Sequence, residues 1–80
     1  VGDKAGLAYT SFSISAVYYK KEEVDVGVKY AALGFFICKK LGMEYVLTQM
    51  SWLLDPVLDQ VGEAELLRLG QEMAAKKGIV

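Results

Sequence analysis

The sequence predicts an all-α fold of four helices, arranged as two antiparallel pairs. Apolar residues recur at helical spacing along most of the chain, and no stretch shows the strict alternation of a half-buried strand. No Asn-Gly or Asp-Gly pair marks a hairpin turn. With 80 residues, of which 54% are hydrophobic, the chain suits one folded domain, 1–80, and is too short for a multidomain enzyme.

Two helices are predicted in the first half of the chain. The first has its apolar residues between 7 and 18 and ends at the charged cluster 20–23. The second is predicted over 23–40, with acids at its start and two lysines in its last turn, which suits the helix dipole. Gly42 follows it and favours a left-handed cap at its end.

The second half predicts another pair of helices. A third helix is expected over 45–54, where it stops at Asp55 and Pro56. These two residues suit an N-cap followed by proline in the first helical position, so the fourth helix is predicted to begin there. It ends in the lysine and glycine segment 76–78, and Gly62 offers a place where it could split.

The two predicted pairs also resemble each other in sequence. At an offset of 36 residues, six positions of the first half match identical residues of the second, namely Lys4, Gly6, Tyr9, Ser15, Leu33 and Gly34 with Lys40, Gly42, Tyr45, Ser51, Leu69 and Gly70. An offset of 40 is the alternative, although it sets Asp55 against Ser15, a poorer match. The favoured offset predicts repeat one at about 4–42 and repeat two at about 43–80.

One motif in the first pair carries a family resemblance. Ile14 stands where that family has leucine, Ser15 stands for its glycine, and Tyr18 matches its tyrosine. Gly27, nine residues later, occupies a small position, and Gly34 a second one. With a period in the mid-thirties, this pattern resembles the tetratricopeptide repeat, although the family's tryptophan, phenylalanine and proline are replaced. The resemblance implies helix pairs stacked as a right-handed superhelical segment.

The small positions have a physical meaning in that arrangement. Ser15 and Gly27 are expected to let two helix backbones approach closely, and Gly34 to do the same for the following repeat. The resemblance further implies that Tyr18 points inward and Tyr19 outward. Cys38 lies near a helix end with no histidine partner, which indicates a core or boundary residue.

The resemblance also implies a concave groove lined by the first helix of each pair. Its exposed positions would be Tyr9, Phe12, Ser13, Ala16, Tyr19 and Lys20 in the first copy, and Tyr45, Thr48, Gln49, Trp52 and Asp55 in the second. This surface is aromatic with little charge, and the chain has no asparagine for the family's clamp on a peptide carboxylate. An apolar groove suits an amphipathic helix or an extended hydrophobic peptide. Alternatively, these aromatic side chains pack against neighbouring repeats of a longer parent protein.

Several other functional classes are disfavoured by composition. The chain has no histidine and one cysteine, which removes the common zinc sites and the histidine general bases, so no catalytic residue, metal or cofactor is expected. The acidic residues lack the spacing of a calcium loop. A net charge of −1 without a basic run disfavours nucleic acid. The longest apolar run, 30–38, is about half the ~20 residues of a membrane span, and no targeting signal is visible, so a cytoplasmic protein is expected.

The leading functional hypothesis is therefore a non-catalytic scaffold or adaptor that binds another protein or a peptide. The competing hypothesis is an assembly domain that holds copies of this chain, or parts of a parent protein, together. Arrays of this family usually need about three repeats and a polar capping helix. Two repeats alone leave apolar faces open, which predicts a homodimer unless the fourth helix folds back as a cap. Because Val1 is not a methionine, a fragment of a longer protein is also expected.

Overall fold

The computed structural model describes residues 4–78, and within this range it contains five helices and no strand. Both ends of the predicted domain, 1–3 and 79–80, lie outside the described residues. The helices are α1 (Lys4–Lys20), α2 (Val24–Leu41), α3 (Glu44–Gln49), α4 (Ser51–Val61) and α5 (Glu63–Lys76). The all-α prediction is confirmed.

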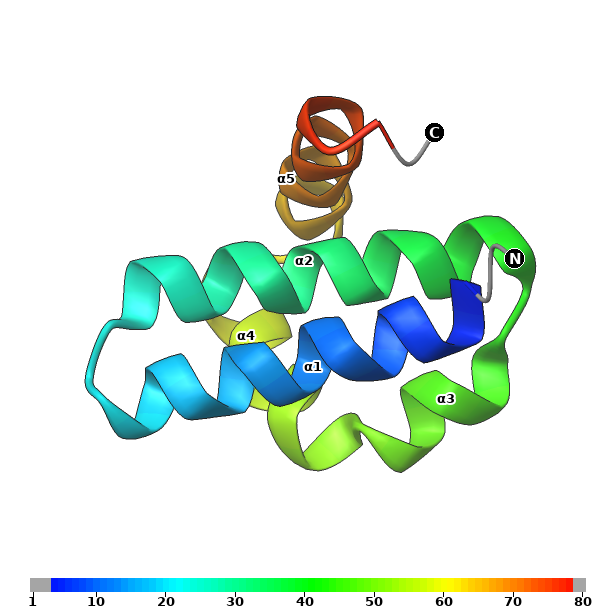
Figure 1. Ribbon diagram of the computed structural model, residues 1–80. Coiled ribbons are helices and arrows are strands. Elements are labelled where there is room, and N and C mark those ends of the chain that lie inside the picture. Colours follow the sequence, from blue (N-terminus) through cyan, green and yellow to red (C-terminus); the bar gives the residue numbers. More distant parts are fainter. Residues whose placement is uncertain (1–3, 79–80) are drawn as a thin grey trace.

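The central element is α2, which lies between α1 and α5 (Figure 1). It runs antiparallel to α1, as predicted for the first pair. Most of its residues from Gly27 to Cys38 are buried, because neighbouring helices cover it on several sides. It ends at Leu41 and is capped by Gly42, which has a left-handed backbone (φ 69°) and whose N–H donates to the carbonyls of Cys38 and Lys39. The predicted cap is confirmed.

Ser15 and Gly27 lie in contact between α1 and α2. The Ser15 Oγ donates a buried hydrogen bond of 2.7 Å to the Gly27 carbonyl oxygen. A Cβ atom at Gly27 would lie 3.1 Å from the Tyr19 ring, so any larger residue would push against that ring. The close approach predicted for Ser15 and Gly27 is confirmed.

The orientation predicted for the two adjacent tyrosines is wrong. Tyr19, not Tyr18, follows Ser15 by one helical turn, so its ring shares the face of α1 that contacts α2. Tyr18 instead stacks on the ring of Tyr30, with ring centroids 6.0 Å apart and an interplanar angle of 6°. Tyr19 therefore points between the helices, and Tyr18 lies on their flank.

The second half departs from the prediction at Asp55 and Pro56. No helix begins there, because α4 starts at Ser51 and continues through Pro56 to Val61. The break falls instead at Met50, between α3 and α4. Proline inside a helix removes one N–H donor, here the donor to the carbonyl of Trp52, and α4 bears this loss in its interior. The expected third helix is thus divided between α3 and the first turn of α4.

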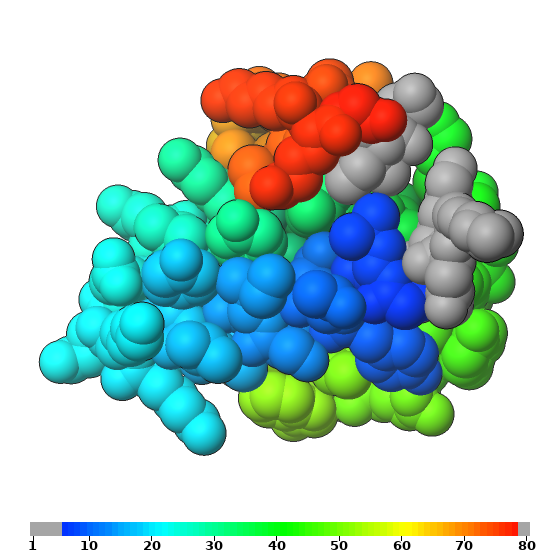
Figure 2. All heavy atoms as spheres, viewed as in Figure 1, coloured from blue at the N-terminus to red at the C-terminus, as the bar shows by residue number. Residues whose placement is uncertain are grey.

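Gly62 does split the last predicted helix, as its sequence position suggested. Its backbone (φ 85°, ψ 155°) is one that glycine adopts readily, and it separates α4 from α5. After this break α5 turns across α2, and Figure 1 shows it almost end-on above that helix. In Figure 2 its orange and red atoms lie above the blue face of α1, which stays open toward the viewer. The main contact of α5 is with α2 and not with α4, so the second predicted pair is the looser one.

Two further small residues decide how α2 packs. A Cβ at Gly34 would lie 2.7 Å from the Phe12 ring, so this glycine faces α1. Its predicted role in packing the following repeat is therefore wrong. The small residue at the contact between α2 and α5 is Gly70, where a Cβ would overlap the Ala32 carbonyl oxygen of α2. The two helix backbones cross in contact at this point.

Candidate functional site

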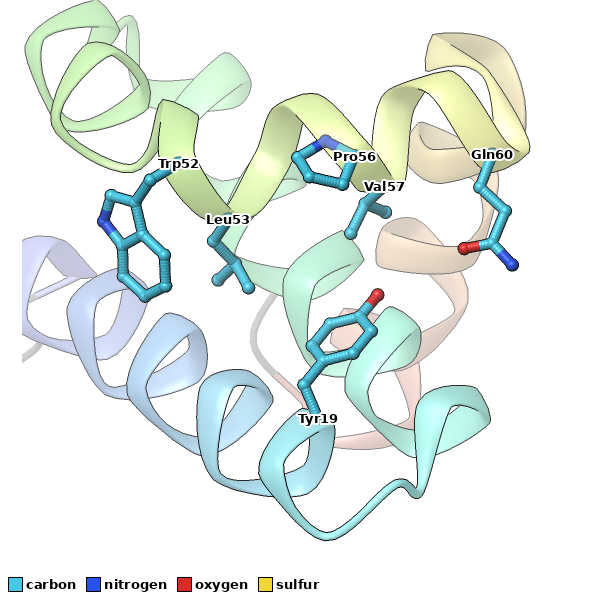
Figure 3. A pocket seen from close by; sticks show the side chains of 6 residues that line it. All are labelled: Tyr19, Trp52, Leu53, Pro56, Val57 and Gln60. Carbon is cyan, nitrogen blue, oxygen red and sulfur yellow. The ribbon is translucent and has the colours of Figure 1, made fainter.

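An apolar hollow between the end of α1 and α4 is the best candidate site. We call it the Tyr19 cleft and define it by the residues that line it, Tyr19, Trp52, Leu53, Pro56, Val57 and Gln60. Its volume is about 150 Å³. Figure 3 shows the Tyr19 ring rising from α1 toward α4, while the side chains of Trp52 and Leu53 hang from α4 on the other side. The cleft thus lies at the junction of the two halves of the chain.

The periodicity of α4 builds one wall of the Tyr19 cleft. Trp52, Pro56 and Gln60 are spaced four residues apart and form one row along the helix. Leu53 and Val57 form the adjacent row, and both are buried in the core. The buried row fixes α4 against the rest of the molecule, and the exposed row faces solvent. One edge of α4 is therefore held firmly while the other is presented for contact.

Trp52 is the most exposed large apolar side chain among the described residues. Its fractional exposure is 65%, in contrast to 6% for the neighbouring Leu53. An indole left this open contributes nothing to the core, although it carries a large apolar surface and one N–H donor. Burial of that surface by a partner would release the most free energy available at this site.

The Tyr19 hydroxyl oxygen is buried and has no hydrogen-bond partner among the described residues. Burial also raises the pKa of this phenol above its ordinary value, because the ionised form loses hydration. Leaving a buried hydroxyl unpaired costs about 1–3 kcal/mol. Because the oxygen is screened from solvent, a ligand could reach it only after neighbouring side chains move. The cleft therefore presents an apolar wall, and the unpaired polar atom of Tyr19 stays buried beside it.

Tyr19→Phe tests this description of the hydroxyl. Removal of an unpaired buried hydroxyl is expected to raise the free energy of unfolding by about 1 kcal/mol. Urea unfolding would measure the change, with Tyr9→Phe as the matched control. The Tyr9 hydroxyl donates to Gln49 Oε1 at 2.6 Å, so its removal should lower stability or leave it unchanged. Destabilisation by Tyr19→Phe would show that the hydroxyl has a partner.

Four of the residues predicted to line a groove come together in the structure, as two separate pairs. Tyr19 and Trp52, from the two predicted repeats, line the same cleft. Tyr9 and Gln49 are joined by the hydrogen bond just described, which links α1 to α3. The prediction that α1 faces the second predicted repeat is met at these two places, while the main contact of α1 is with α2.

The other predicted groove residues are dispersed. Phe12 is a correction, because its ring is 1% exposed and packs against Gly34, so it cannot be a groove residue. Ala16 is half-buried on α1. The remaining ones are exposed on the surface outside the Tyr19 cleft, namely Ser13, Lys20, Tyr45, Thr48 and Asp55. The Thr48 hydroxyl donates to the Glu44 carbonyl of its own helix at 3.2 Å.

Four residues of the cleft were missed by the sequence analysis, namely Leu53, Pro56, Val57 and Gln60. The signal that could have identified Pro56 and Gln60 is the four-residue spacing that places them on one helical row with Trp52. This row was hidden by the interpretation of Asp55 and Pro56 as the start of a new helix.

Other kinds of site find little support in the described residues. Within 4–78, no three side chains of the metal-binding types lie close enough together to hold an ion. Cys38 is buried in the core, as expected, and this burial, followed by the charge of Glu44, raises the pKa of its thiol to about 11. None of the described helices combines the length and apolar character needed to cross a membrane. Comparison with known protein families, with characterised proteins and with solved structures gives no match.

Proposed function

We propose that this chain is a non-catalytic protein-interaction module, and that the Tyr19 cleft accepts one hydrophobic side chain of a partner peptide. The observation that carries the proposal is the exposed Trp52 beside an apolar cleft that the Tyr19 ring also lines. Tryptophan and tyrosine are enriched among the residues that contribute most to protein interfaces. The helical scaffold would then serve as an adaptor, in keeping with the resemblance to tetratricopeptide repeats.

The size of the cleft supports a single anchoring side chain. An apolar cavity of roughly 150 Å³ is large enough to hold benzene. The Tyr19 cleft has a similar volume, so a leucine or phenylalanine side chain matches it. Such a partner would gain affinity from apolar burial.

Trp52→Ala is expected to weaken peptide binding by at least about 2 kcal/mol, or roughly 30-fold, while stability changes by less than about 0.5 kcal/mol. The probes are amphipathic helical peptides with leucine or phenylalanine along one face. Since Trp52 is the one tryptophan in the chain, its emission in the parent protein reports directly on the cleft. Calorimetry would give the affinity of the variant, which has lost this fluorophore.

The matched control for this experiment is Tyr45→Ala. Tyr45 is 58% exposed and lies on α3, outside the cleft, so its loss should leave binding within about twofold of the parent protein. Equal affinity of the parent and the Trp52 variant for every bound peptide would contradict the proposal. Unfolding of the Trp52 variant would contradict the assignment of this residue to the surface.

A second candidate is self-association, which is favoured by the other exposed apolar side chains. Val17 and Leu41 are 49% and 45% exposed, and these residues would be covered in a dimer. Sedimentation over a wide range of concentrations distinguishes the two candidates. A monomer at every concentration that still binds peptides would exclude assembly as the main role, whereas a dimer that Trp52→Ala dissociates would place the second copy on the cleft.

A further inference from the structure

The last helix, α5, is held mainly by its contact with α2. Leu66, Gly70 and Ala74, spaced four residues apart, form the buried row of α5. In the middle of this row the Gly70 backbone crosses the Ala32 carbonyl of α2, where no larger residue fits. Contacts between α5 and α4, the helix that precedes it in the chain, are few. The docking of α5 therefore depends on the surface of α2 and hardly on the neighbouring α4.

The connection between α4 and α5 is a single residue in an unusual conformation. Gly62 (φ 85°, ψ 155°) lies in a region of backbone conformation that is nearly exclusive to glycine. Its N–H donates to the Leu58 carbonyl at 2.8 Å and its carbonyl accepts from the Leu66 N–H at 3.1 Å, so helical bonding reaches the break from both sides. Apart from its two chain neighbours, no described residue has an atom within 4 Å of the position of a Cβ on Gly62. The bend is therefore not fixed by packing around the hinge.

A helical conformation at Gly62 would join α4 and α5 into one helix. The bend leaves the amide groups of 63–65 and the carbonyl groups of 59–61 without helical partners, as at any helix end. In a continuous helix over 51–76 these groups would bond to one another, although Asp59 and Glu63 would then stand one turn apart with like charges, which opposes the straight form weakly. Such a helix would be about 39 Å long. The longest dimension of the folded chain is 33 Å, so a straight α5 would project from its own core instead of crossing α2.

We propose that two copies of this chain exchange their α5 helices. In the resulting dimer Gly62 is helical, and the α5 helix of each copy packs on the α2 surface of the other. The buried row of α5 meets the same crossing at Ala32 that it meets within a single chain, so its apolar contacts are kept. Two such exchanges close a symmetric dimer and leave neither α2 surface open. The inference is independent of the Tyr19 cleft, whose lining residues belong to α1 and α4.

Gly62→Ala tests the exchange, because alanine is strained in the bent conformation and favoured in a helix. Sedimentation of the intact chain over a wide range of concentrations is expected to show a dimer at least about tenfold tighter than any dimer of the parent protein. A folded monomer at every concentration would overturn the inference. An unfolded chain would overturn it as well, since the exchanged dimer retains the whole core.

Gly78→Ala is the matched control for this substitution. Gly78 also has a positive φ (68°) and an open surrounding, but it lies beyond the end of α5, so its replacement joins no two described helices. The association should then stay within about twofold of the parent protein. Equal dimerisation of the two variants would show that strain in general, and not the hinge, causes association, and would overturn the inference.

A further pair of changes distinguishes exchange from contact between closed subunits. A short glycine linker inserted after position 62 of the Gly62→Ala chain lets α5 fold back on its own α2, so the monomer should return. Trp52→Ala in the Gly62→Ala chain should leave the dimer intact, because Trp52 lies in the Tyr19 cleft and outside the exchanged contact. A dimer that survives the linker, or that Trp52→Ala dissociates, would be assembled through an exposed surface and would overturn the inference.

Discussion

Phe12→Ala is expected to lower the free energy of unfolding by about 3–5 kcal/mol, the usual cost of removing a buried phenyl ring. The ring is 1% exposed and fills the space that Gly34 leaves between α1 and α2. Since small domains are stable by only about 5 kcal/mol or slightly more, most of the native stability should be lost. Urea unfolding followed by circular dichroism at low temperature would measure the change.

The effect of Gly34→Ala on the free energy of unfolding is expected to change sign between the parent protein and the Phe12→Ala variant. In the parent protein the new Cβ would lie 2.7 Å from the Phe12 ring, so the substitution should destabilise the fold. In the Phe12→Ala background the same methyl group occupies part of the cavity and adds helix propensity, so it should stabilise. A loss of stability in both backgrounds would contradict the contact between these two residues.

Gly70→Ala is expected to destabilise the protein by about 3 kcal/mol, at the upper end of the cost of overpacking. A methyl group there would overlap the Ala32 carbonyl oxygen and would lie 2.5 Å from the Phe36 Cβ. The carbonyl belongs to the backbone of α2 and cannot rotate away, so α2 and α5 must move apart. Helix propensity alone predicts the opposite result, a gain of about 1 kcal/mol. Chemical unfolding therefore distinguishes overpacking from helix propensity, because the free energy of unfolding falls in the first case and rises in the second.

Gly27→Ala is the matched control for Gly70→Ala, since both replace a glycine inside a helix. The new methyl group at Gly27 would meet the Tyr19 ring at 3.1 Å, and a side chain can shift by a few tenths of an ångström. Its cost should be clearly smaller than that at Gly70. A gain of stability in Gly70→Ala, or equal losses at the two positions, would mean that α5 does not cross α2 in backbone contact.

Much of the helical structure could be predicted because its signals are local. The left-handed cap at Gly42 and the break at Gly62 depend on backbone conformations that glycine adopts readily. The acidic start and basic end of α2 indicate its position, because these charges complement the helix dipole. The prediction failed at Pro56, because α4 keeps a proline in its interior while its buried side, Leu53, Leu54 and Val57, packs in the core. There, tertiary packing outweighed the local preference.

The sequence by itself determined the all-α class and the burial of Cys38, while the close approach of Ser15 to Gly27 was implied by the family resemblance. The first two depend on hydrophobic period and residue type along one helix. Only the tertiary structure decided that Tyr19 points between the helices and that Trp52 stands beside it. These positions depend on how α4 and α5 lie against the first pair, and that depends on contacts between residues far apart in the chain, such as Gly70 with Ala32. Helical spacing places a side chain on a face of its own helix, but the neighbour that covers this face is selected by packing of the whole core.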